Sequence, residues 1–272
     1  VPDYTHLKNN SGKVKALFLT HGHEDHIGGI PYLIQNINIP VIYAPALAAS
    51  LIKHRLEDHR LLDRTKIVIY DENTVVPIDD FKVSFFRVTH SIPDSFALAI
   101  HTPVGTVVHT GDFKIDYTPI DDQKIDLGRL AELGNRGVLA LLSDSTNSER
   151  RGYTMSESTV GEVFDKLFAN CKKRIVIATF ASNMHRVQQI VNSAAANGRK
   201  IAVCGRSMIN MINTAVELGY INAPKNIFIE LDMIKNYTDE QLVIITTGSQ
   251  GEPMSALTRM ANGEHKKVNI NS

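Results

Sequence analysis

The sequence predicts an α/β protein built from two successive domains. Strand-like segments crowd its first half, strands and helices alternate in its second half, and the pattern changes near residue 155. The 272 residues are 43% hydrophobic and 21% charged, an ordinary globular composition that supplies a large core. We therefore expect one domain over residues 1–155 and a second over residues 156–272.

Short β-prone segments separated by loops dominate the first half. VKALFLT, at residues 14–20, is an apolar run that predicts a buried strand feeding a functional loop. Residues 47–58 predict a helix, and a glycine pair precedes another helical segment that ends near residue 37. Further strands are predicted at residues 40–45, 65–70, 82–90, 96–102 and 105–112.

In the second half, predicted strands and helices alternate, as is typical of a parallel sheet. After a helical segment at residues 156–171, strands and helices alternate at residues 173–181, 183–200, 200–205, 207–219 and 242–248. A β-α-β-α-β order implies parallel strands with helices on the faces of the sheet.

Composition also excludes several classes of protein. The two cysteines do not form a disulfide framework and fit a reducing compartment. No apolar run approaches the roughly 20 residues of a membrane span, and the first ten residues do not resemble a signal peptide. We expect a soluble, cytoplasmic protein. Its net charge of zero gives no electrostatic sign of a nucleic-acid partner.

The strongest motif is HGHEDH, directly after the first predicted strand. It places four potential metal ligands within six residues: His21, His23, Asp25 and His26. Imidazole nitrogen and carboxylate oxygen suit zinc, manganese or iron. One ion cannot easily accept all four ligands, so the spacing indicates a paired site. The alternative is a histidine-rich surface loop.

Two further candidates end strands in the same half. His90 closes the segment KVSFFRVTH, and Asp112 follows the strand that ends in HTG. Taken singly, His90 would be structural and Asp112 a turn residue. Together with HGHEDH they are better interpreted as ligands.

HGHEDHIGG resembles the H-x-H-x-D-H signature of the metallo-β-lactamase superfamily. That resemblance implies a four-layer αββα sandwich for the first half. It also implies that His21, His23 and His90 hold one metal, that Asp25 and His26 hold a second, and that Asp112 bridges both. Two divalent ions, with zinc expected first and manganese second, would activate a water for hydrolysis. Asp25 is a further candidate for orienting that nucleophile.

The second half resembles the β-CASP domain of nucleic-acid-processing members, and several segments resemble the ribonuclease J family. These segments are TGDFKID, ATFASNMHR, GRSM and GSQGEPMSAL. SDSTN resembles the acidic motif of the β-CASP group. The resemblance implies a 5′-to-3′ exoribonuclease with endonuclease action, a dimer or tetramer, and partners in RNA decay. Asp144 of SDSTN matches an acidic motif and becomes a catalytic candidate; a capping or turn role is its alternative.

In that family the loop matching Ala181, Ser182 and Asn183 contacts RNA. Hydroxyl, amide and backbone N–H groups at a helix start can bind phosphate, but Ser182 or Asn183 can equally cap the following helix. The family's β-strands that precede the strand leading into HGHEDH, an H-x-S-G-H motif and a final metal histidine of the family are absent. We therefore expect a segment of such a protein, with an incomplete sandwich, an incomplete β-CASP domain and weak activity. The competing functions are a small-molecule hydrolase and an inactive scaffold.

Overall fold

The computed structural model describes residues 3–268 and residue 270, and it divides the chain into two compact units. Unit 1 is Val1–Ser156 and unit 2 is Glu157–Ser272. Among the described residues, no helix is long and apolar enough to cross a bilayer.

Unit 1 contains two sheets. A parallel sheet has the order β1-β2-β3, with β1 at Leu17–Phe18, β2 at Val41–Ala44 and β3 at Lys66–Ile69. A second sheet has the order β4-β5-β6-β7-β8. Its strands are Val75–Ile78, Phe81–Arg87, Phe96–Thr102, Gly105–His109 and Ala140–Leu142, and only the β7–β8 pair is parallel.

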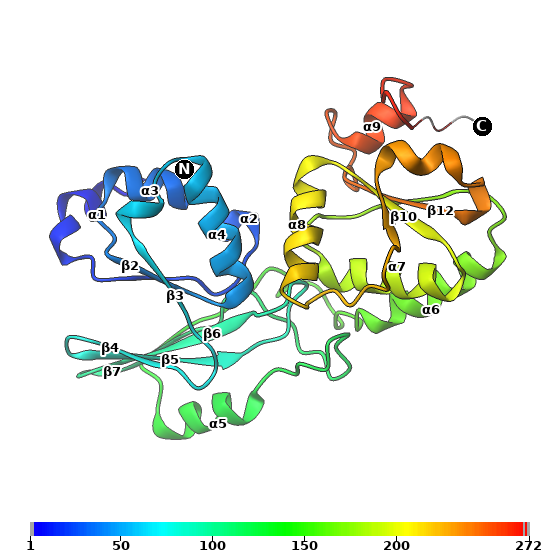
Figure 1. Ribbon diagram of the computed structural model, residues 1–272. Helices are drawn as coiled ribbons and strands as arrows, with labels where there is room; N and C mark the ends of the chain where they lie inside the picture. Colours follow the sequence, from blue (N-terminus) through cyan, green and yellow to red (C-terminus); the bar gives the residue numbers. More distant parts are fainter. Residues whose placement is uncertain (1–2, 269, 271–272) are drawn as a thin grey trace. The chain divides into compact units, whose positions relative to one another are not determined.

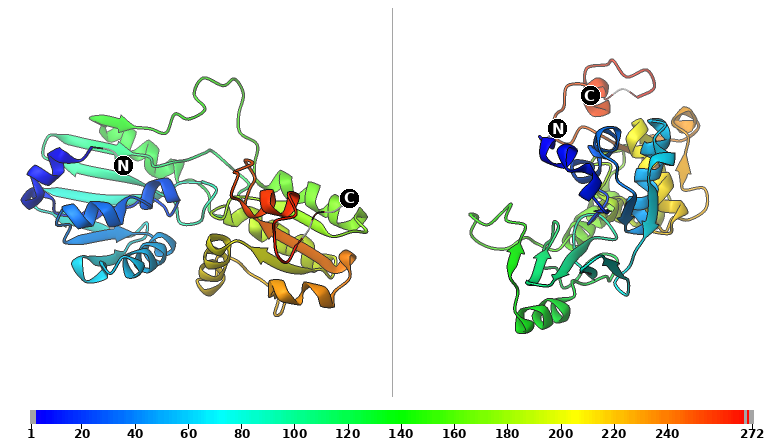
Figure 2. Two further views of the ribbon diagram at one scale, coloured as in Figure 1. Left: turned by 90° about the horizontal axis from the view of Figure 1, so that it is seen from above. Right: turned by 90° about the vertical axis from the view of Figure 1, so that its left-hand side faces the viewer.

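Three apolar clusters hold these layers together. The first cluster joins β1 and β2 to the helices α3 (Ile30–Asn36) and α4 (Ala46–Asp58). A second cluster lies between the two sheets, where Phe85 of one sheet stacks on Tyr70 and packs near Phe18 of the other. The third cluster joins the larger sheet to α5 (Leu127–Arg136). The predicted αββα sandwich is confirmed, and its layers are visible in Figures 1 and 2.

The edge of the larger sheet is less well covered. Leu141 and Leu142 of β8 and the preceding Leu139 are all more than half exposed. β8 is the edge strand of this sheet, and its three residues are exposed. The first predicted strand is also shorter than expected, because only Leu17 and Phe18 pair with β2 before the chain turns toward its polar loop.

Unit 2 is a parallel sheet with helices against it. The strand order is β11-β10-β12-β9, with β9 at Ile175–Ala178, β10 at Lys200–Cys204, β11 at Phe228–Ile229 and β12 at Leu242–Thr246. Its helices are α6 (Ser158–Asn170), α7 (Met184–Ala196), α8 (Arg206–Glu217) and α9 (Ala256–Ala261). The central strand β12 is buried at all five positions, so the predicted α/β class holds here as well.

Candidate metal centre

The chain after β1 is fixed by hydrogen bonds from other strands. The Tyr70 hydroxyl donates to the carbonyl oxygen of Leu19 at 2.6 Å. The Phe96 N–H, from the second sheet, donates to the carbonyl oxygen of Thr20 at 3.0 Å. These bonds hold the backbone just before His21, whose side chain is completely buried.

Two glycines let the ligand-bearing loops approach their neighbours. A Cβ at Gly22 would lie 3.0 Å from the Leu51 side chain of α4. Gly111 has a φ of +60°, and a Cβ there would meet Thr20 at 3.0 Å and the Phe96 carbonyl at 3.2 Å. Because only glycine adopts this backbone cheaply, it lets the loop carrying Asp112 lie against the loop carrying His21.

Three more ligand candidates come from the start of a single helical turn. His23 is the N-cap residue of α2 (Glu24–Ile27), and both Asp25 and His26 belong to that turn. The turn folds the chain back, so that the His26 ring lies 4.1 Å from the His21 ring, centroid to centroid. The sequence motif is therefore a compact cluster rather than an extended histidine-rich loop.

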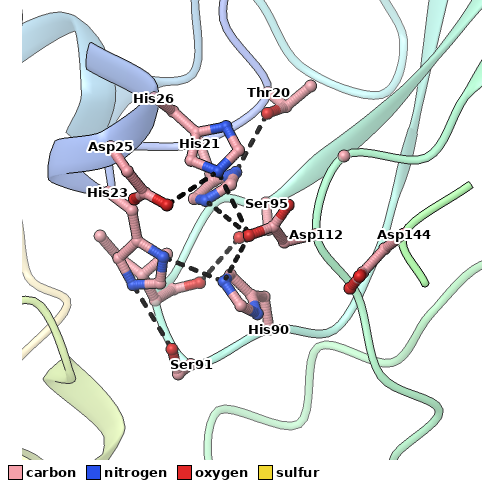
Figure 3. A network of polar contacts seen from close by, with 12 residues as sticks. Thr20, His21, His23, Asp25, His26, His90, Ser91, Ser95, Asp112 and Asp144 are labelled. Atoms are coloured by element: carbon pink, nitrogen blue, oxygen red, sulfur yellow. Dashed lines mark hydrogen bonds and ion pairs between the residues drawn. The ribbon is translucent and has the colours of Figure 1, made fainter. Parts of the chain in front are cut away.

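His90 and Asp112 are brought together by a short antiparallel bridge. Thr89 pairs with Lys114, and the Lys114 N–H donates to the Thr89 carbonyl oxygen at 2.8 Å. The bridge brings the segment after β5 beside the segment after β7. Both predicted strand-end residues thus reach the HGHEDH cluster, as Figure 3 shows.

One carboxylate oxygen of Asp112 lies at the centre of the cluster. Its Oδ2 is 3.2 Å from His26 Nε2, 3.8 Å from His90 Nε2 and 4.0 Å from His21 Nε2. The potential ligand atoms form two overlapping groups, each within 4.8 Å: His21, His23, His90 and Asp112, and then Asp25, His26 and Asp112. Asp112 belongs to both groups, which is the position a bridging carboxylate requires.

The buried imidazoles fit a divalent cation. His21 Nε2 is buried and has no hydrogen-bond partner among the described residues. Burial, reinforced by the neighbouring imidazoles, lowers the pKa of His21 to about 2 and that of His23 to about 4. Burial also lowers the pKa of His90 to about 4. All three rings are therefore neutral near pH 7, the state in which imidazole binds metal.

Two hydroxyl groups orient these rings, and sequence reasoning did not single them out. The Thr20 hydroxyl lies 3.0 Å from His21 Nδ1. The Ser91 hydroxyl lies 3.4 Å from His23 Nε2, while His23 Nδ1 lies 3.0 Å from His90 Nε2. Groups that hold the second nitrogen of a ligating histidine fix its ring orientation. The available signal was a hydroxyl residue directly before His21 and directly after His90.

Asp144 lies beside the cluster but belongs to neither ligand group. Its Oδ2 accepts the Phe113 N–H at 3.2 Å, and its Oδ1 accepts the N–H and hydroxyl of Thr146 at 2.9 and 2.8 Å. Burial raises the pKa of Asp144, but these hydrogen bonds together outweigh burial and lower that pKa below its usual value. The carboxylate thus ties its own turn to the residue that follows Asp112.

The residues predicted to contact RNA lie in unit 2, between β9 and α7. Asn183 is the N-cap of α7, and its side-chain oxygen accepts the Arg186 N–H at 3.0 Å. The Met184 N–H donates to the Ser182 carbonyl oxygen at 3.0 Å. Ala181, Ser182 and Asn183 are each partly exposed. The capping alternative is therefore observed for Asn183, and the RNA contact stays a prediction.

Comparison with known families matches both halves of the chain. The family model described as "Metallo-beta-lactamase superfamily" matches residues 7–146. The model described as "Ribonuclease J, beta-CASP domain" matches residues 172–272. The two matches fall in the two units that the structure separates.

Curated relatives extend the similarity over almost the whole chain. A ribonuclease J of Synechocystis sp. is 49% identical over 99% of this chain and 42% of its own length. A ribonuclease J of Helicobacter pylori is 45% identical over 99% of this chain and 39% of its own length. This chain therefore spans less than half of these relatives. A crystal structure of a protein of unknown function from Enterococcus faecalis shares the fold, with a TM-score of 0.60, 14% identity, and coverage of 88% of this chain and 60% of that one.

Proposed function

The chain belongs to the metallo-β-lactamase superfamily and, within it, to the ribonuclease J family; on that premise we propose that it carries the metal centre of a ribonuclease. The observation that carries this proposal is the convergence of five potential ligands around the Asp112 carboxylate. The match of residues 172–272 to a ribonuclease J domain supports RNA over a small-molecule substrate.

Each ligand has a proposed place. His21, His23 and His90 would hold one divalent cation, Asp25 and His26 would hold a second, and the Asp112 carboxylate, which belongs to both ligand groups, would contribute to both sites. The nitrogen-rich first group favours zinc, with manganese as the alternative. When bound, such a pair lowers the pKa of water and stabilises negative charge on a phosphate.

The protein side chains supply orientation. The Asp25 side chain is 80% exposed and lies 3.7 Å from His26 Nε2, and its proposed further role is to orient the attacking water. Asp144 acts as a positioning residue, because its carboxylate holds the loop that carries Asp112. Ala181, Ser182 and Asn183 are proposed to contact the RNA backbone.

The whole-protein properties are proposals of the same kind. We propose 5′-to-3′ exonuclease action with some endonuclease action, self-association as a dimer or tetramer, partners in RNA decay, and a cytoplasmic location. The chain covers 42% or less of the two ribonuclease J relatives described above.

Two measurements test the proposal. Metal content and calorimetry with Zn²⁺ or Mn²⁺ should give two ions per chain, and a His21→Ala, Asp112→Ala double variant should hold none. RNA with 5′-monophosphate, 5′-triphosphate or 5′-hydroxyl ends is then digested with the metal-loaded chain. Mononucleotide release fastest from the monophosphate, lost in the double variant, supports the exonuclease. A wild-type chain that binds no divalent ion would contradict the proposal.

A further inference from the structure

Unit 2 contains a cavity that the metal centre does not use. It has a volume of about 520 Å³ and lies at the carboxyl ends of β10 and β11, where Cys204 and Glu230 line it. Side chains of α8 form one wall, and Arg259, His265 and Lys266 of the C-terminal segment also line it. Ligands of open α/β sheets bind at this end of the strands, and the volume is typical of small-molecule sites.

Charged groups of both signs line this cavity. Arg259 and Lys266 form no ion pair with any described carboxylate, whereas Lys267 pairs with Asp232 at 2.7 Å. Glu230, directly after β11, is also without an ion pair among the described residues. The cavity thus offers two cations and a carboxylate that have no ion pair among the described residues. An anion near Arg259 and hydroxyl groups near Glu230 would satisfy these groups.

Hydrogen bonds and apolar packing hold the C-terminal segment, which carries Arg259 and Lys266, in place. The Val268 N–H donates to His265 Nδ1 at 3.1 Å, so a neutral His265 carries its hydrogen on Nε2 and donates it to Cys204 Sγ, also at 3.1 Å. Val268 and Met260 are buried in the same apolar cluster as Cys204. The C-terminal segment is therefore fixed to the end of β10, and the cavity is preformed.

The order of elements around the cavity indicates which ligand fits. A strand (β10), a glycine with a φ of +112°, a helix (α8) and a strand (β11) lead to an acidic residue at the strand end, Glu230. In nucleotide-binding α/β folds, an acidic residue at this place accepts hydrogen bonds from ribose hydroxyls. Ile209, Ile212 and Phe228 supply an apolar wall for a flat base.

We propose that this cavity binds a ribonucleoside monophosphate, either free or as the terminal nucleotide of an RNA. Arg259 and Lys266 hold the phosphate, Glu230 accepts a hydrogen bond from the ribose 2′-hydroxyl, and the apolar wall contacts the base. The site lies within unit 2 and needs none of the metal ligands, so its test is independent of the ribonuclease proposal.

The first experiment is calorimetric titration of the full chain with AMP, dAMP and adenosine in EDTA. AMP should bind saturably, and Arg259→Gln and Lys266→Gln should each weaken AMP by about tenfold, the loss expected for one contact between a cation and a phosphate. Lys235→Gln makes the same charge change outside the cavity and should alter affinity less than about twofold. Equal affinity in wild type and in both cavity variants overturns the proposal.

The second experiment tests ribose recognition and the source of the nucleotide. Wild type should prefer AMP to dAMP, and Glu230→Gln should reduce that preference to near one. Short RNAs with a terminal 5′- or 3′-monophosphate, compared with AMP, show whether a free nucleotide or an RNA end binds more tightly. Amide NMR should show shifts at residues 203–206 and 228–231 for either source. Shifts confined to residues 20–26 overturn the proposal.

Discussion

His21 and His265 are two imidazoles in opposite situations. His21 is fully buried, one ring nitrogen meets the Thr20 hydroxyl, and the other has no partner among the described residues. At His265 both ring nitrogens are engaged, one by the Val268 N–H and the other by the Cys204 sulfur. A buried polar atom left unpaired costs about 1–3 kcal/mol. His21 is therefore arranged for an added ligand, whereas His265 completes a structural contact.

Removing His21 should have the largest effect. In His21→Ala, we expect affinity at the first metal position to fall more than about 100-fold, because losing a direct ligand exceeds the loss of a residue that only orients one. Calorimetry with Zn²⁺ and metal analysis after dialysis measure this. His265→Ala is the matched control and should keep both metals. Full metal occupancy in His21→Ala would remove the distinction between the two rings.

The next largest effect concerns the pH dependence of stability, to which a buried histidine of the candidate metal centre should contribute. Burial lowers the pKa of His90 to about 4 from an unfolded value near 6.5. The unfolded chain therefore takes up a proton before the folded chain does, so stability is lost as pH falls from about 6.5 toward 4. For His90 alone the loss is about 2 kcal/mol by pH 5.

Urea unfolding of metal-free protein between pH 7 and 4.5 measures this dependence. The His90→Ala variant should show a shallower loss of unfolding free energy than wild type. His54→Ala removes an exposed histidine and should retain the wild-type slope. A His90→Ala slope as steep as the wild-type slope would contradict the assignment.

A smaller effect is expected from the hydroxyl that orients His21. Thr20→Val preserves side-chain shape but removes the group 3.0 Å from His21 Nδ1. We expect metal affinity to fall about tenfold, because an oriented ligand loses its support. Thr20→Ser keeps a hydroxyl and should bind metal as wild type does. Equal affinity in Thr20→Val and wild type would show that packing alone positions the ring.

The smallest effect is expected at Asn183. Like His265, Asn183 has a side chain that already makes a hydrogen bond within the protein. Asn183→Ala removes the cap of α7 and should lower the unfolding free energy by about 1 kcal/mol. Asn183→Ser should keep most of this stability in urea unfolding. If Asn183→Ser also keeps full RNA affinity in a binding titration, the Asn183 amide does not contact RNA.

The sequence predicted which candidate ligands would lie together better than it predicted the contacts that hold them. HGHEDH, His90 and Asp112 could be found because metal-binding side chains followed apolar strands, and the structure brings all six together. The bridge between Thr89 and Lys114 could not be predicted, because it depends on how two loops meet after five strands have paired. The same holds for Asp144, whose hydrogen bond to the Phe113 N–H spans 31 positions.

Among the helices and strands, too, some could be predicted from the sequence and others could not. Strong apolar periodicity predicted α4, β6 and β12 nearly to their ends. The pattern missed β4 and β8, which are short strands with mostly exposed side chains, and also missed α5. The cavity in unit 2 was likewise invisible, because its lining comes from a strand end, a helix and the C-terminal segment. Local pattern predicts elements, whereas surfaces that join distant segments require the fold.

The wide sequence separation of the metal ligands has a consequence for folding kinetics. His26 and Asp112 are 86 positions apart, and the sheet pairings between them must form before the two side chains meet. Long-range contacts of this kind form slowly. A cation that needs ligands from all three loops has no complete site until these loops have met. Its binding free energy therefore stabilises the chain only after the rate-limiting step of folding. Bound metal should therefore mainly lower the unfolding rate and leave the folding rate almost unchanged.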